Sequence, residues 1–273
     1  MPLALKVALS ALRRPARLHF GDTPSQVGDL HVPPGPGPFP VAVLLHGGHW
    51  QSRFGKLVCR PLALDLAGRG WAVWNLEYRR LGEGRGSGGG WPATFDDVAV
   101  GVDHLAALDD ARLDLSQLAI IGHSAGGQLA LWAAGRTELP SGAVGAHPRV
   151  GVRWVVGLAP VTDLARAGAT ARALMGGGPE EVPERWHQAD PLRSEPPHQP
   201  VLIVHGQDDS TISVTRSREY VERCRTKGAD VELVDPPGES HRDPVDPASA
   251  SWAAAATWLE GRVGDARPPA PRR

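Results

Sequence analysis

One serine, Ser124, lies at a position in the sequence that is typical of an enzymatic nucleophile. Ser124 lies in LAIIGHSAGGQL (118–129), where an apolar run passes through Gly-His-Ser-Ala-Gly directly into a helical pattern. G-x-S-x-G at such a strand-to-helix junction is typical of a nucleophile elbow, which projects the serine hydroxyl at the N-terminus of a helix. The sequence therefore predicts acyl transfer at Ser124. A glycine-rich turn with an uninvolved serine is the alternative interpretation.

A serine hydroxyl is a weak nucleophile at neutral pH, so Ser124 needs a histidine base that a carboxylate orients. The stretch PVLIVHGQDDS (200–210) offers Asp208 and Asp209 after an apolar run, and VELVDPPGESHRD (231–243) offers His241 in a glycine-containing loop. Loops that leave the carboxyl ends of parallel strands meet at one rim of the sheet. We therefore expect an acid and His241 to converge on Ser124, although His241 could also be an ordinary exposed histidine.

The stretch VAVLLHGGHW (41–50) can be interpreted in two ways. His46 and His49 could bind a metal ion, but catalytic zinc usually has three protein ligands and no third is evident. The other interpretation is that the backbone N–H groups of this stretch are the functional groups, because acyl transfer needs N–H donors aimed at the developing oxyanion. One such donor is expected from Ala125, the residue after the nucleophile. The glycines of the HGG segment would let a second loop turn its amides inward. We therefore expect no metal.

The elements that must position these residues alternate between short apolar runs and helical patterns. We predict strands at 16–20, 27–32, 41–46, 72–76, 118–122, 152–158, 201–205 and 231–234, and helices at 56–67, 93–108, 125–135, 214–226 and 248–259. This alternation predicts a three-layer α/β fold with a mostly parallel sheet covered on both faces. Residues 33–40 and the glycine-rich segment 82–92 are predicted loops, and 165–200 is a predicted helical or irregular insertion.

Composition narrows the class of protein. The 273 residues have a net charge of −1, 41% hydrophobic and 22% charged residues, which gives no reason to expect nucleic acid or an anionic membrane as a partner. Two cysteines cannot form a disulfide framework, the N-terminal segment is a poor signal peptide, and no apolar run reaches 18 residues. We expect one cytoplasmic domain over 1–263 and a disordered Pro/Arg-rich tail over 264–273.

Taken together, five stretches resemble the α/β-hydrolases of the esterase, lipase and arylformamidase group. They are HGGHWQS (46–52), GHSAGG (122–127), APVTDL (159–164), HGQDDS (205–210) and GESHRD (238–243), which occur in the family's order and cover nearly the whole chain. The resemblance implies an α/β-hydrolase fold, that is, an eight-stranded mostly parallel sheet with helices on both faces. It also implies that 165–200, between strands six and seven, is an insertion of the lid or cap type.

The resemblance also implies roles for individual residues. The acid of such enzymes lies four residues after the HG-type strand end, which favours Asp209 over Asp208. The HGGxW motif assigns Gly48 and His49 as the remaining oxyanion donors beside Ala125. Arg242 is a departure, because similar hydrolases often follow the catalytic histidine with an aromatic or apolar residue. The implied activity is hydrolysis of small to medium carboxylic esters, with no cofactor and a small-molecule ester or amide as substrate.

Several alternatives stay open at this point. HGGHWQS is also similar to the motif of arylformamidases, which hydrolyse N-formyl aromatic amines such as N-formylkynurenine. A peptidase is less favoured, because prolyl oligopeptidases usually add a β-propeller. A non-catalytic binding protein on the same fold is a further possibility. The G-x-G-x-x-G pattern of Gly84, Gly86 and Gly89 could indicate a dinucleotide site, but it follows the fourth strand rather than opening the sheet. The oligomeric state stays open.

Overall fold

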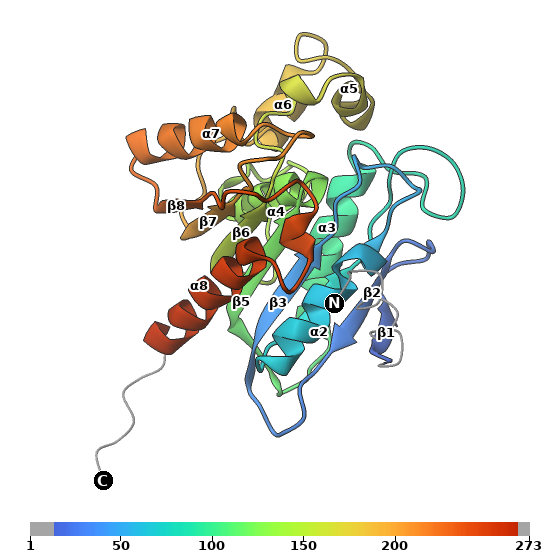
Figure 1. The fold of residues 1–273 in the computed structure, drawn as a ribbon. Coiled ribbons are helices and arrows are strands. Elements are labelled where there is room, and N and C mark those ends of the chain that lie inside the picture. The colour runs from blue at the N-terminus through green and yellow to red at the C-terminus, as the bar shows by residue number, and fades with distance from the viewer. Residues whose placement is uncertain (1–13, 267–273) are drawn as a thin grey trace.

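An eight-stranded sheet forms the centre of the computed structural model, which describes residues 14–266 (Figure 1). The strands are β1 (Ala16–His19), β2 (Val27–His31), β3 (Phe39–Leu45), β4 (Ala72–Leu76), β5 (Leu113–His123), β6 (Trp154–Leu158), β7 (Val201–Val204) and β8 (Val231–Val234). Their order in the sheet is β1-β2-β4-β3-β5-β6-β7-β8. Only β2 runs against its neighbours, and all the other pairs are parallel. The predicted eight-stranded, mostly parallel sheet is therefore confirmed.

Helices cover both faces of this sheet. They are α2 (Arg60–Gly68), α3 (Ala93–Asp103), α4 (Ala125–Ala134), α5 (Ala169–Met175), α6 (Pro183–Ala189), α7 (Val214–Thr226) and α8 (Ala250–Ala266). Short 3-10 turns are η1 (Lys56–Cys59), η2 (His104–Ala107), η3 (Gly135–Glu138), η4 (Ala165–Ala167) and η5 (Asp243–Val245). Within residues 14–266, none of these helices combines the length and apolar character of a membrane-spanning segment.

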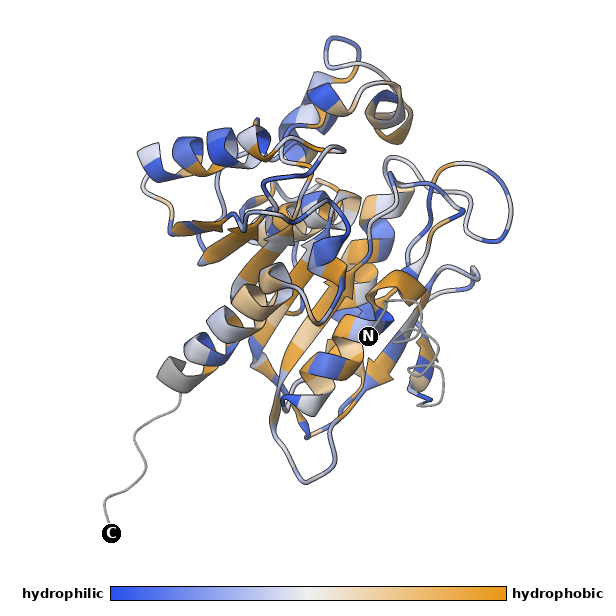
Figure 2. Cartoon of the chain, viewed as in Figure 1, coloured by the Kyte–Doolittle hydropathy of each residue, from blue (hydrophilic) through white to orange (hydrophobic). Residues whose placement is uncertain are grey.

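The two-residue period of the strands divides the core into two layers. Along β3, Val41, Val43 and Leu45 pack on the side of α3, α4 and α7, whereas Ala42 and Leu44 pack on the side of α2 and α8. Figure 2 shows the resulting apolar strands between helices whose outer faces are polar. Strands that bury side chains on both faces read as nearly continuous apolar runs, which is why the sequence located most of them.

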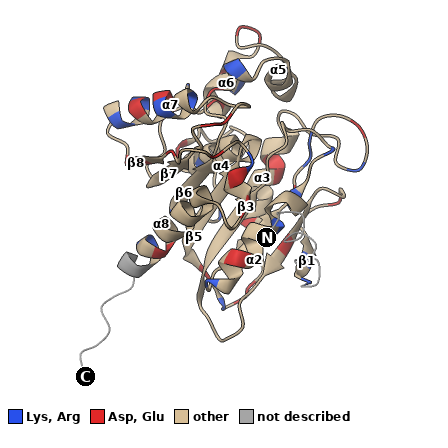
Figure 3. Cartoon of the chain, in the orientation of Figure 1, with Lys and Arg blue, Asp and Glu red and all other residues tan. Residues whose placement is uncertain are grey.

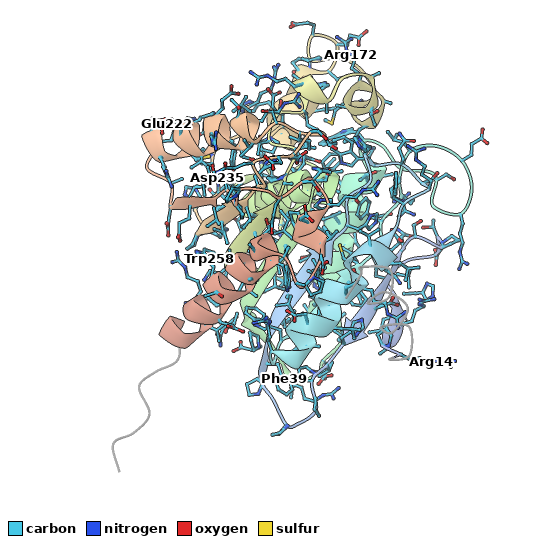
Figure 4. The ribbon with its side chains drawn as sticks, in the orientation of Figure 1. Arg14, Phe39, Arg172, Glu222, Asp235 and Trp258 are labelled. Carbon is cyan, nitrogen blue, oxygen red and sulfur yellow. The ribbon has the colours of Figure 1, made fainter. Side chains whose placement is uncertain are left out.

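Most charged residues lie outside this core, and a few, such as Asp97, are buried. Figure 3 shows the central strands almost free of charge, while α7 carries residues of both signs along its length. At the sheet edge, Trp258 of α8, labelled in Figure 4, donates its indole N–H to Glu232 of β8 over 2.6 Å. This contact fixes α8 against β8, and the loop that carries His241 connects these two elements.

Several element boundaries differ from the predicted ones. Pro61, in the first turn, allows α2 to begin only at Arg60, so the predicted helix starts as the 3-10 turn η1. The helix predicted over 93–108 leaves α geometry after Asp103 and continues as η2. Strand β3 begins at Phe39, inside the stretch predicted as a loop, and β5 begins at Leu113 because the two pair there before a register shift. Helix α8 reaches Ala266, and the remainder of the predicted tail, 267–273, lies outside the described residues, as do 1–13 with most of the N-terminal segment.

The NLEYRR segment (75–80), which begins in β4, makes ion pairs through Glu77 and Arg79. The Arg79 guanidinium and backbone N–H donate to Asp97 over distances of 2.6–2.8 Å, and Glu77 accepts from Arg80 and His46. Asp97 is fully buried. Its carboxylate therefore serves this ion pair.

The insertion between β6 and β7 contains η4, α5 and α6. The buried Asp190 accepts hydrogen bonds from the backbone N–H groups of Leu164 (3.1 Å) and Leu192 (3.2 Å), so it joins the two ends of the insertion. The insertion also contacts the glycine-rich loop, because the Trp91 N–H donates to the Leu174 carbonyl over 2.6 Å. These two irregular segments therefore form one connected unit.

Candidate active site

Ser124 occupies a sharp turn between β5 and α4. Its φ of 54° and ψ of −116° lie in the left-handed half of backbone space, where a side chain other than glycine is strained. Its N–H donates to the Leu158 carbonyl over 2.9 Å, which holds the turn against β6. A Cβ atom added at Gly122 would lie 2.0 Å from the Gly126 carbonyl oxygen, and one added at Gly126 would lie 2.2 Å from the Leu45 carbonyl oxygen. Both glycines are therefore required by close backbone approach.

Replacing Gly126 with alanine should disrupt this turn. The added methyl group overlaps backbone atoms of β3, which cannot move away as a flexible side chain could, so we expect a loss of roughly 3 kcal/mol or more in the free energy of unfolding. The matched control is Gly135→Ala at the other end of α4, where an added Cβ has no heavy atom within 4 Å. Urea denaturation of both variants measures the difference. Equal stability of the two variants would contradict the steric account of the turn.

Ser124, His241 and Asp209 form one hydrogen-bonded chain. The Ser124 Oγ lies 2.9 Å from His241 Nε2, and His241 Nδ1 lies 2.6 Å from Asp209 Oδ2. The three come from the ends of β5, β7 and β8, separate strands of one half of the sheet. Ser124 and Asp209 are buried, and 13% of the His241 side chain is exposed. Asp208, the other candidate acid, is exposed.

Hydrogen-bond donors surround Asp209. Its Oδ1 accepts the backbone N–H groups of Thr211 and Ile212, both over 2.8 Å, and Oδ2 accepts from His205 Nε2 over 3.0 Å as well as from His241. Burial alone would raise the pKa of Asp209, but the hydrogen bonds from His205, His241 and Ile212 hold it well below its usual range. The carboxylate is therefore ionised at neutral pH.

His123, the residue before Ser124, holds the loop that carries His241. Its Nε2 donates to the His241 carbonyl oxygen over 2.8 Å, and the two ring centroids are 4.9 Å apart. Burial, followed by the charge of His241, lowers the pKa of His123 to about 3, so the ring is neutral at physiological pH. The loop is fixed further where the Asp208 N–H donates to the Glu239 carbonyl over 3.0 Å. A Cβ at Gly206 would lie only 2.2 Å from that carbonyl oxygen, which explains the glycine in HGQDD.

The HGG segment passes directly beside Ser124. A Cβ built on Gly47 would lie 2.9 Å from the His123 carbonyl oxygen and 3.0 Å from the Ser124 Cβ, so only a glycine allows this approach. Gly48 (φ 124°) and His49 (φ 53°) then have left-handed backbone conformations, in a turn closed by the Gln51 N–H and the Gly48 carbonyl over 2.9 Å. Across residues 14–266, the backbone N–H groups of Gly48, His49 and Ala125 have no acceptor. Three amides at this end of the sheet are thus free to bind a ligand oxygen.

His46 supports this loop from below. Its Nδ1 lies 2.8 Å from the Gly47 carbonyl oxygen and its Nε2 lies 2.7 Å from Glu77, so both ring nitrogens face acceptors. Burial would raise the pKa of Glu77, but the charge and hydrogen bond of His46, with Arg80, lower it to about 2. Tyr78 stacks on the His46 ring with centroids 4.4 Å apart. The first histidine of HGGHW is therefore engaged inside the protein.

The two histidines of HGGHW do not converge on a common point for a metal. His46 is fully buried in the contacts above, whereas the His49 side chain is exposed. No group of three metal-ligating side chains occurs anywhere in the part of the chain that the structure describes. Trp50 is buried beneath the loop, and its indole N–H donates to Gln128 over 3.2 Å. Gln128 in turn donates to the Ala189 carbonyl over 2.8 Å, which connects the HGG segment to α4 and to the insertion.

A cavity of about 780 Å³ opens away from Ser124. It is lined by the C-terminal half of α4 and by residues of η3, the following loop, α6 and the segment 194–198. Ser124 precedes the first residue of α4, whereas Leu131–Gly135 line the cavity, a separation of roughly 11–16 Å along the helix axis. This cavity is therefore too far from the Ser124 hydroxyl to hold an acyl group that the hydroxyl attacks.

Sequence reasoning missed three residues that contact the site. His205 was assigned only to a strand end, although its place four residues before Asp209 was a signal. Ser217 gave no signal, because it is one of several polar residues of α7, yet it is fully buried against His205. Gln128 likewise reads as an ordinary helical residue, and only the fold shows that it bridges two loops.

Comparisons with known proteins agree with this architecture. The profile of the family described as BD-FAE matches residues 29–223. The esterase LipC of Mycobacterium tuberculosis is 28% identical over 251 residues, which cover 82% of this chain and 59% of LipC. This chain thus spans less than two thirds of that relative.

Solved structures agree on the fold. A truncated form of a carbohydrate esterase from gut microbiota superposes with a TM-score of 0.77 at 20% identity, covering 92% of this chain and 100% of that one. Esterase 2 of Thermogutta terrifontis with bound butyrate superposes with a TM-score of 0.70 at 19% identity, covering 95% and 96% of the two chains. These likenesses confirm the predicted α/β-hydrolase fold.

Proposed function

This chain belongs to the BD-FAE family, and we propose that it is a serine esterase that hydrolyses small to medium carboxylic esters. The observation that carries the proposal is the hydrogen-bonded chain from Asp209 through His241 to Ser124, which ends beside three unpaired backbone amides. LipC and both solved structures are also named as esterases. An ester is the substrate class that such a site and such relatives have in common.

In the proposed reaction, the Ser124 Oγ attacks the ester carbonyl while His241 Nε2 takes the hydroxyl proton. Asp209 accepts from His241 Nδ1–H, so it orients the ring and stabilises the imidazolium that forms. The carbonyl oxygen becomes an oxyanion, and Gly48, His49 and Ala125 are the proposed donors to it. Each such donor contributes about 2.7–4 kcal/mol of transition-state stabilisation.

The acyl-enzyme then forms and breaks down. His241 returns the proton to the alkoxide, the alcohol leaves, and Ser124 stays esterified to the acyl group. A water molecule then gives a proton to His241 and attacks the acyl carbonyl, which releases the acid and restores the Ser124 hydroxyl. None of these reaction steps requires a cofactor.

The insertion 165–200 and the glycine-rich loop 82–92 are the proposed borders of the substrate pocket. Their support is connectivity: the two segments meet at the Trp91–Leu174 hydrogen bond, and the insertion reaches the HGG segment through Gln128. Arg242, next to His241, is exposed, so it would present a polar guanidinium where similar hydrolases often have an apolar side chain. The same machinery could cleave an N-formyl aromatic amide, which the HGGHWQS motif favours as a second candidate.

A substrate panel separates these candidates. For p-nitrophenyl acetate or butyrate we expect kcat/KM of about 10⁴ M⁻¹ s⁻¹ or more, because an assembled triad with free oxyanion donors lies within the ordinary enzymatic range. Acetylated sugars and N-formylkynurenine complete the panel, and Ser124→Ala is the control for background hydrolysis. A kcat/KM for N-formylkynurenine tenfold above that of every ester would identify a formamidase instead. No turnover of any of them would favour a non-catalytic binding protein.

A further inference from the structure

We infer that His205 and Ser217 are positioning residues that form a second hydrogen-bonded arm on Asp209, opposite the arm that leads to Ser124. The inference rests on the proposed function, because Asp209 is the acid of the proposed triad. His205 follows the last residue of β7, Asp209 lies four residues later, and Ser217 lies in the first turns of α7. The arm therefore spans the whole β7–α7 junction.

The geometry repeats that of the triad on the other side of the same carboxylate oxygen. His205 Nε2 lies 3.0 Å from Asp209 Oδ2, and His205 Nδ1 lies 2.7 Å from the Ser217 Oγ. On the proposed catalytic side, the corresponding distances are 2.6 Å and 2.9 Å. One carboxylate oxygen thus receives two imidazole N–H groups, and each imidazole contacts a serine hydroxyl with its other nitrogen.

The contacts of His205 determine its tautomer. Nε2 faces two oxygens without protons, Asp209 Oδ2 and, at 2.8 Å, the Ile212 carbonyl, so Nε2 must carry the proton. Nδ1 faces a hydroxyl that can donate, and in the proposed arm Ser217 supplies that hydrogen bond. The hydroxyl therefore keeps the N–H of the ring pointed at Asp209.

Burial holds the hydrogen bonds of this arm in one geometry. The side chains of His205 and Asp209 are both fully buried, and so is Ser217, so no water competes for these hydrogen bonds. With Thr211 and Ile212 on Oδ1, the carboxylate cannot rotate without losing a donor. The hydrogen bond from His205 is also the leading contribution that lowers the pKa of Asp209 against the effect of its burial.

The arm also shares the negative charge of Asp209. A carboxylate oxygen that already accepts from His205 attracts the His241 imidazolium less strongly than one that accepts from His241 alone. The titratable groups that face this arm are Asp209 from its own loop, His241 from the loop after β8, and His123 from the end of β5, whose pKa is lowered mainly by burial. His205 should therefore affect both the position of the acid and the pH at which His241 acts as a base.

The test compares His205→Phe, which removes the donor, with His205→Gln, whose amide can donate to Asp209 while its carbonyl accepts from Ser217. For His205→Phe we expect kcat for p-nitrophenyl acetate to fall roughly tenfold to a hundredfold with little change in KM, because the acid loses its fixed orientation. The acid limb of the kcat/KM profile should move to higher pH by about half a unit to one unit, because more charge on Asp209 favours protonated His241. His205→Gln should restore most of the rate and of the limb position.

Ser217→Ala tests the arm without changing the buried ring, should His205→Phe fail to fold. A weaker donor at His205 Nε2 should move the acid limb in the same direction by a smaller amount, and Thr226→Ala at the exposed far end of α7 is the matched control. An acid limb unchanged from wild type in His205→Phe or, where that variant does not fold, in Ser217→Ala would overturn the inference. So would a rate loss that His205→Gln does not repair.

Nitrogen-15 NMR of the imidazole rings separates this inference from the proposed function. In Ser124→Ala, which should lack activity, the spectrum should still report a neutral His205 protonated at Nε2. A His205 ring protonated at Nδ1 would overturn the inference even if the protein is an esterase. If the wild-type protein has no Ser124-dependent turnover but His205 is protonated at Nε2, the proposed function fails while the hydrogen-bonded arm stands.

Discussion

Replacing Ser124 with alanine is expected to lower kcat for p-nitrophenyl acetate by about 10⁴- to 10⁶-fold, to the level that binding and free amides alone provide. The reason is that Oγ is the only atom that the site offers for covalent attack at the end of the Asp209–His241 chain. Without Oγ, His241 can still act as a base, but only water remains for it to deprotonate. Steady-state kinetics under substrate saturation measures this loss.

The fold should survive this change. Alanine is smaller than serine and keeps the backbone contacts of the turn, and Ser124 Oγ has no partner except His241 among the described residues. Ser116→Ala, in the same strand β5 but at its opposite end and exposed, is the matched control and should retain wild-type kinetics. Wild-type turnover in a folded Ser124→Ala protein would rule out the proposed mechanism with Ser124 as the nucleophile.

The second large effect is expected at Asp209. Asp209→Asn should lower kcat by about 10³- to 10⁴-fold, because an amide N–H₂ facing His241 favours the tautomer that carries its proton on Nε2. That tautomer cannot accept the Ser124 proton. The amide would also face the N–H of His205, so we expect some loss of stability in addition. Kinetics and thermal unfolding, measured on the same preparation, separate the two effects.

Asp208→Asn is the matched control for this prediction. Asp208 is the adjacent residue, has the same chemistry and is exposed. Its replacement should change kcat by less than about twofold, since surface substitutions away from a site have small effects. If Asp208→Asn is the more damaging of the two, the assignment of the acid to Asp209 is wrong.

The sequence located the fold well because buried strands and amphipathic helices leave strong local patterns. Strands β4 and β8 and helix α7 have the predicted bounds, and the topology follows from strand–helix alternation. The insertion was less predictable, because its two short helices, α5 and α6, lie in a stretch where prolines and glycines break any period. The extension of β5 to Leu113 depends on pairing with Phe39, which is a long-range contact that no local pattern reports.

The residues of the candidate site likewise include some that the sequence predicted and some that it could not predict. Strand ends were enough to predict that an acid and His241 approach Ser124, because loops at the carboxyl ends of parallel strands share a rim. The choice of Asp209 over Asp208 came from the resemblance to α/β-hydrolases. The glycines of HGG and GHSAGG were recognisable because close approach of backbones leaves room for no other residue. The arm of His205 and Ser217 was not predictable, since it depends on which way a buried ring points, and spacing alone does not determine that.

The central claim is that Ser124 forms a covalent acyl-type adduct, and active-site labelling tests it most directly. The protein is incubated with a fluorophosphonate, digested, and analysed by mass spectrometry, with residual esterase activity measured in parallel. The account predicts one adduct per chain, on the peptide that contains Ser124, and loss of activity in proportion to labelling. Complete inactivation with the adduct on another residue, or full activity with no adduct at Ser124, would contradict it.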